Sequence, residues 1–159
     1  MMELKSTGGF SLTELLVVIA IISITATIAV PQFTKMKNNA NLKEAAREIS
    51  GDIQLCRRMA VSENVHYRIV INTANNEYTI QKETSPSIWV NVSSTKNVGG
   101  EYADVKIVGD PTYGADKIVF QPRGTTNAGT LKIQHEKSLS KASIVTSLMG
   151  RVRVKYELK

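Results

Sequence analysis

The sequence has very few of the residues that build cross-links, metal sites or catalytic centres. Its 159 residues include one cysteine, Cys56, which excludes an internal disulfide. Two histidines, His66 and His135, and that cysteine fall short of the ligand set of a tetrahedral zinc site. No P-loop, GxSxG or HExxH pattern occurs, and no nucleophile is paired with a base. We therefore expect a non-enzymatic protein without a metal or a cofactor.

The overall composition is that of an ordinary folded protein of one domain. Apolar residues make up 42% of the chain and charged residues 21%, so wholesale disorder is not expected. The apolar residues are unevenly distributed, however. Fifteen of the 21 residues from Phe10 to Val30 are apolar, which is the length and composition of a membrane-spanning helix. Pro31 follows directly and either kinks this helix or marks its end.

Glu14 is the residue of this apolar segment that most needs an explanation. A carboxylate inside a spanning helix costs about 2.5–3.5 kcal/mol on insertion scales, so it usually has a partner or a function. A cleavable secretory signal, with residues 1–6 as its basic end, is one interpretation of the segment. The segment is longer than the apolar core of such signals and lacks a clear A-x-A cleavage site, which argues against this interpretation.

The residues around Glu14 form a more specific pattern. The sequence KSTGG at residues 5–9, followed by FSLTE at 10–14 and an apolar helix, resembles the class III signal of type IV pilins and type II secretion pseudopilins. The resemblance implies that prepilin peptidase cuts the chain after Gly9 and that Phe10 becomes N-methylated. It also implies that Glu14 compensates the charged N-terminus of a neighbouring subunit, so that two charges costly alone in lipid are tolerated together.

The same resemblance implies a location. It places the chain in the bacterial inner membrane as a single-pass protein, with the C-terminal domain in the periplasm, before assembly into a pilus or pseudopilus. The basic residues near the segment favour the opposite orientation, because Lys5 precedes it and four cations follow it, namely Lys35, Lys37, Lys43 and Arg47. The motif takes precedence, because the leader has to be cytoplasmic to be processed.

A helical pattern continues beyond Pro31. Apolar residues recur at steps of three and four as far as about Glu63, at Leu42, Ala46, Ile49, Ile53, Cys56 and Ala60. Asn64 is a suitable stop, and Cys56 is expected to be a small buried residue rather than a nucleophile. A helix from Phe10 to Glu63 would be about 80 Å long.

After Asn64 the hydrophobic period changes from that of a helix to that of a strand. Residues 65–72 alternate, a turn follows at 73–76, and a returning strand contains Tyr78 and Ile80. Further short strands are predicted at 88–92, 105–108, 117–120, 130–134, 143–148 and 151–156. We expect both histidines on exposed strand faces.

The predicted fold class is α+β, with a long N-terminal helix, its first half transmembrane, packed on an antiparallel sheet; the pilin resemblance implies this lollipop arrangement. The expected divisions are a leader at 1–9, a transmembrane and assembly helix at 10–30, its amphipathic continuation at 31–64 and a β-rich globular domain at 65–159.

The surplus positive charge lies at the C-terminal end. Residues 117–159 carry a net charge of +7, whereas residues 1–116 carry −1. In the last predicted strand, alternation places Arg151, Arg153 and Lys155 on one face, about 6.6 Å apart. This spacing is close to that of every second phosphate along a nucleic-acid strand. The alternative is a solvated outer face of a strand that packs on the core.

The C-terminal sequence also resembles one pseudopilin family. KIVFQPRG at 117–124, GTL at 129–131 and IVTSLMGRVRV at 144–154 resemble the conserved end of the GspH/FimT family. Its members include the H minor pseudopilin of type II secretion and a minor type IV pilin of DNA uptake. In the second of these, a Gly-Arg-x-Arg tail contacts DNA.

Two functions follow from this resemblance. The first is a filament subunit that binds double-stranded DNA through Arg151, Arg153 and Lys155, with Arg123 and Lys132 as possible helpers, during competence. The alternative is an H-type minor pseudopilin that contacts protein partners at the pseudopilus tip. In both cases the expected partners are other pilins or pseudopilins of the filament.

Overall fold

The computed structural model describes residues 10–98 and 104–159 and contains one long helix, α1 (Leu12–Glu63). The structure divides into two units, one ending at Met36 and one running from Lys37 to Lys159, and α1 contributes to both. Pro31 lies inside α1 and does not end it. The predicted end at Glu63 is confirmed, and Asn64 has φ 55°, the left-handed conformation that terminates many helices.

The part of α1 in the first unit is apolar on all sides. Its large hydrophobic side chains from Leu12 to Met36 are each 45–74% exposed. Its hydroxyl groups bond back to the helix, as when Ser23 Oγ donates to the Ile19 carbonyl at 2.7 Å and Thr27 Oγ1 to that of Ser23 at 2.8 Å. Among the described residues, α1 is the one helix long and apolar enough to cross a membrane.

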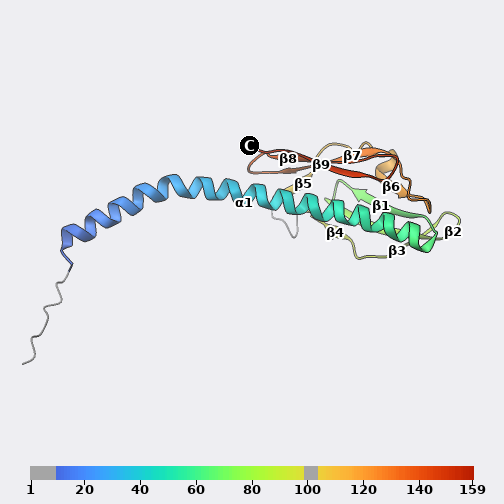
Figure 1. The fold of residues 1–159 in the computed structure, drawn as a ribbon, viewed down its shortest axis with the longest axis horizontal. Coiled ribbons are helices and arrows are strands. Elements are labelled where there is room, and N and C mark those ends of the chain that lie inside the picture. The colour runs from blue at the N-terminus through green and yellow to red at the C-terminus, as the bar shows by residue number, and fades with distance from the viewer. Residues whose placement is uncertain (1–9, 99–103) are drawn as a thin grey trace, which may run out of the picture. The chain divides into compact units, whose positions relative to one another are not determined.

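The strands of the second unit form two antiparallel sheets (Figure 1). The first has the order β3 (Ile88–Asn91), β2 (Glu77–Ser85), β1 (Tyr67–Asn72) and β6 (Lys117–Phe120), with β4 (Lys96–Asn97) also paired to β2. The second has the order β5 (Val105–Ile107), β7 (Gly129–His135), β8 (Lys141–Thr146) and β9 (Val152–Glu157). A short 3-10 helix, η1 (Gly114–Asp116), precedes β6. The predicted α+β class is confirmed.

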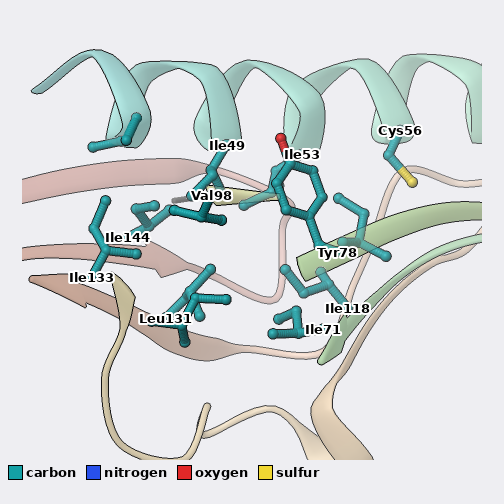
Figure 2. Close-up of a cluster of buried hydrophobic side chains, with 14 of the residues drawn as sticks. Ile49, Ile53, Cys56, Ile71, Tyr78, Val98, Ile118, Leu131, Ile133 and Ile144 are labelled. Atoms are coloured by element: carbon teal, nitrogen blue, oxygen red, sulfur yellow. The ribbon is translucent and has the colours of Figure 1, made fainter. Parts of the chain in front are cut away.

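The core lies between the last part of α1 and the inner faces of both sheets. Figure 2 shows Ile49, Ile53 and Cys56 pointing from α1 toward side chains of the sheets. The predicted apolar stripe is confirmed, and its buried residues are Leu42, Ala45, Ala46, Ile49, Ile53, Cys56 and Ala60. Each large aliphatic side chain buried here contributes about 1.5–3 kcal/mol. One helix stripe therefore holds two sheets together.

Cys56 occupies this core as a small apolar residue, as predicted. Its side chain is fully buried. Burial, with a smaller effect from the Asp52 carboxylate, raises the pKa of the Cys56 thiol to about 12. The thiol is therefore protonated at neutral pH and is not a nucleophile.

A polar cluster attaches β4 to the helix. Lys96 Nζ donates to Asp52 Oδ2 at 2.8 Å and to Glu48 Oε1 at 3.0 Å, and Tyr78 Oη donates to the same Asp52 oxygen at 2.7 Å. Burial lowers the pKa of Lys96, but the hydrogen bonds to Asp52 and Glu48 outweigh it and raise the pKa overall. The sequence pattern did not predict β4, because a strand of two residues has no detectable periodicity.

The prediction for His135 was wrong, because its side chain is fully buried. Its Nε2 has no hydrogen-bond partner among the described residues. Burial lowers the pKa of His135, and the Asp104 carboxylate, which acts in the opposite direction, does not outweigh it. The other histidine, His66, is partly exposed, and its Nδ1 lies 2.9 Å from Glu83 Oε2.

The burial of His135 makes stability depend on pH. Because its pKa in the folded chain lies below the ordinary value of 6.5, the unfolded chain binds the proton more tightly. The free energy of unfolding should fall as the pH drops below 6.5, by at most about 1.4 kcal/mol per pH unit from this group. Urea unfolding of the full chain in neutral detergent, followed by the fluorescence of its one tryptophan, Trp89, measures this between pH 7.5 and 5.

Two variants isolate the contribution of His135. His135→Leu should flatten this part of the pH profile, whereas His66→Gln, which removes the other histidine, should retain it. The same profile in His135→Leu and in the parent chain would show that His135 is not the group responsible.

Candidate functional site

The residues predicted for processing and assembly lie at the start of the described chain. Phe10 is 83% exposed and precedes α1, and Glu14 is in the first turn of the helix. A carboxylate at this position also interacts favourably with the helix dipole. Gly9 and the leader lie outside the described residues. From Leu15 to Val30 the exposed large side chains of α1 are aliphatic, which suits contact with lipid or with other apolar helices.

The residues predicted for DNA binding lie on the second sheet and its turns. In β9, Val152 and Val154 pack against the core, while Arg153 and Lys155 are exposed on the opposite face. Arg151 is exposed immediately before the strand. The predicted alternation is therefore confirmed for residues 152–155 of this strand.

Strand register brings Lys132 to the same surface. Ser143 of β8 pairs with Lys132 of β7 on one side and with Lys155 of β9 on the other. The two lysines therefore lie in one cross-strand row of the outer face, two strands apart, at about 10 Å. Arg153 lies in the neighbouring row, opposite Val145. We call the surface formed by Lys132, Arg151, Arg153 and Lys155 the basic face.

The charges of the basic face have no ion-pair partner among the residues that the structure describes. Across residues 10–98 and 104–159, none of its four side chains forms an ion pair. Some acidic residues elsewhere are paired with lysines. Asp104 Oδ2 accepts from Lys137 Nζ at 2.7 Å, and this bond lowers the pKa of Asp104. Lys106 pairs with Glu136, which raises the pKa of Lys106. The basic face is therefore a surface of free positive charge.

Arg123 lies on a loop that adjoins the turn before β9. It lies in the loop after β6, directly before Gly124. A Cβ placed on Gly150 would lie 2.6 Å from the Gly124 carbonyl oxygen, so the two loops are in close contact. Because Gly150 precedes Arg151, the structure brings the loops that carry Arg123 and Arg151 together.

Sequence reasoning missed two arginines of α1 beside these loops. Arg57 Nε donates to the Gly124 carbonyl at 3.0 Å, and Arg57 and Arg58 line a hollow together with Arg151. Arg57 follows the buried Cys56 by one residue, so helix periodicity places it at the border of the packed face, whereas Arg58 is exposed. That signal does not reveal which loop lies against them.

Comparison with known proteins identifies the family. Residues 45–150, more than half of the chain, match the family described as type II transport protein GspH. The chain belongs to this family. Residues 4–30 of this GspH-family chain also match the prokaryotic N-terminal methylation motif, and this match includes Gly9, Phe10 and Glu14. No curated protein sequence is significantly similar to it.

Solved structures show that the GspH-family chain has the fold of known pilins and pseudopilins. The minor pseudopilin EpsH from the type 2 secretion system of Vibrio cholerae matches with a TM-score of 0.60 and 13% identity, over 73% of this chain and 97% of that one. The type IV minor pilin FimU of Pseudomonas aeruginosa matches with a TM-score of 0.60 and 20% identity, over 76% and 92%. The chain therefore shares the fold of a minor pseudopilin and of a minor pilin.

Gly150 has a structural role that can be tested. It has φ +70°, and a Cβ there would also lie 2.7 Å from Arg57 Nε. Gly109 has the same φ with nothing within 4 Å, which makes it a matched control. Gly109→Ala should lower the free energy of unfolding by about 1–2 kcal/mol through backbone strain alone.

Gly150→Ala should lower the free energy of unfolding by about 1–3 kcal/mol more than Gly109→Ala does, because the Gly124 loop and Arg57 also have to move. Urea unfolding followed by Trp89 fluorescence measures both variants. Equal costs at the two positions would contradict the close contact.

Proposed function

We propose that this chain is a non-enzymatic minor pilin or pseudopilin that is cut between Gly9 and Phe10 and assembles into a filament through α1. The methylation motif at residues 4–30, followed by a helix segment exposed and apolar on every side, is the observation that carries the proposal. In this proposal Phe10 is N-methylated, the helix from Phe10 to Val30 crosses the bacterial inner membrane, and the C-terminal domain lies in the periplasm. Its partners are prepilin peptidase and the other subunits.

Glu14 sets the register of assembly in this proposal. Cleavage creates a charged amine at Phe10, and a neighbouring subunit's Glu14 lies four residues, or about 6 Å, further along its own helix. An amine and a carboxylate that are each unfavourable in lipid stabilise one another when a shift of this size brings them together. The aliphatic residues supply the lateral contact, and the charge pair fixes the axial shift.

Replacing Glu14 should therefore separate processing from assembly. Glu14→Ala should still be inserted, cut after Gly9 and methylated, as mass spectrometry of membrane-derived protein would show. Its recovery in sheared filaments should fall at least about tenfold, because the neighbour's amine is left unpaired in lipid. Glu44→Ala, which removes an exposed carboxylate from α1 beyond the apolar segment, is the matched control and should assemble normally.

Two results would count against this account. Normal filament recovery of Glu14→Ala would remove the pairing role of Glu14. Retention of residues 1–9 in cells that have the peptidase would overturn the processing step itself.

The basic face favours a second function besides filament assembly. We propose that it captures double-stranded DNA during uptake. Three cations along one edge, Arg151, Arg153 and Lys155, lie at steps of about 6.6 Å, near the spacing of alternate phosphates. Lys132 widens this line into a surface, and Arg123 lies on the adjoining loop. The competing function, an H-type pseudopilin that contacts proteins at a type II secretion tip, requires a partner with carboxylates on the facing surface.

A salt series tests DNA capture. The full chain in neutral detergent should shift duplex DNA of any sequence, and its affinity should fall steeply between about 50 and 200 mM salt. Arg151→Ala/Arg153→Ala should bind at least tenfold more weakly and with a shallower salt slope. Lys43→Ala/Arg47→Ala, which removes two charges from α1, should bind like the parent chain.

The outcomes separate the two functions. Equal binding by the Arg151/Arg153 variant and the parent chain, or no binding at low salt, would remove DNA as a ligand. The filament role would be unaffected.

A further inference from the structure

The hollow that Arg57, Arg58 and Arg151 line lies beside the basic face, between α1 and the turn that joins β8 to β9. It has a volume of about 790 Å³. Its walls are the last turns of the helix and the turn residues, namely Gln54, Arg57, Arg58, Val61 and Ser62 with Met149, Gly150, Arg151 and Val152. We call it the helix groove.

The wall of the helix groove is held in place by contacts already described. Arg57 is partly buried and donates to the Gly124 carbonyl, and the loop carrying Gly124 touches Gly150. Arg57 therefore has a structural contact as well as a charge. Arg58 is exposed, and no ion pair engages it within the part of the chain that the structure describes.

The helix groove is continuous with the basic face. Arg151 and Met149 line it, and the same two residues line a smaller hollow together with Val145, Ser147 and Arg153. Of the described residues that line the two hollows, none is an aspartate or a glutamate. Positive charge therefore extends from β9, around the turn, to α1 without an intervening acid.

We infer that Arg58 binds a phosphate of the same DNA that the basic face binds, so that the DNA backbone crosses the β8–β9 turn at Arg151 and enters the helix groove. Arg57 contributes charge from the wall of the groove. This inference rests on the proposed DNA function and adds α1 to its binding surface. A line of phosphates explains the arrangement because the cations lie on three adjoining segments of the chain, namely β9, the turn before it and α1.

Arg58→Gln is the decisive variant, because it removes the charge from an exposed side chain and leaves the Arg57 contact intact. Arg47→Gln is the matched control. It lies 11 residues earlier, so it has nearly the same direction on the helix but is about 16.5 Å away along the axis. Arg153→Gln reports on the basic face alone. All three should unfold at the same urea concentration as the parent chain.

Binding of duplex DNA is measured for the full chain in neutral detergent across a salt series. Removing one phosphate contact reduces the slope of log K against log salt by about 0.9. Arg58→Gln should show this reduction together with a several-fold loss of affinity, as should Arg153→Gln. Arg47→Gln should have the slope of the parent chain.

Three results would overturn the inference. If Arg153→Gln lowers the slope and Arg58→Gln behaves like Arg47→Gln, the helix groove is not part of the DNA site, and the proposed DNA function stands. If the parent chain binds no DNA at low salt, both fail. If Arg58→Gln leaves DNA binding unchanged but weakens binding to phosphatidylglycerol vesicles, the groove faces acidic lipid.

Discussion

The packing of one helix stripe against two sheets determines which side chains of the core-facing strands point inward and which point outward. Leu42, Ala46, Ile53 and Cys56 are fully buried, and the inner faces of both sheets close on them. Since side chains alternate along a strand, an inward position for Val152 and Val154 requires an outward position for Arg153 and Lys155. The basic face is thus a geometric consequence of the core, and a one-residue slip of β9 would bury its charges.

Periodicity predicted the elements whose burial follows a local pattern. The helix end at Glu63 and the strand at 117–120 agree with the structure residue for residue, because the hydrophobic period changes where the element changes. His135 shows how that signal was misjudged. It follows Leu131 and Ile133 at steps of two, so the alternation itself indicates an inward position, and a neutral imidazole tolerates that burial.

The sequence predicted only those residues of the candidate site that lie together on one short segment of the chain. Arg153 and Lys155 lie in β9 and Arg151 directly precedes it, so alternation along one short segment groups them. The row of Lys132 and Lys155 depends on the register of three strands, which the sequence does not give. The contact of Arg57 with Gly124 joins residues 67 positions apart, and helix periodicity reveals only the side of α1 on which Arg57 lies.

The difference between the paired carboxylates and the unpaired cations of the basic face indicates which kind of ligand this face binds best. Carboxylates such as Asp52, Asp104 and Glu136 are paired with lysines in the same subunit, whereas the cations of the basic face are unpaired within the described residues. Along β9 the spacing of about 6.6 Å between alternate residues is shorter than the Debye length of about 8 Å at physiological salt, so the mutual repulsion of Arg153 and Lys155 is only partly screened. That repulsion raises the free energy of the unbound subunit. A polyanion with regularly spaced charges relieves it at every position, whereas a protein partner does so only where its own carboxylates match the row.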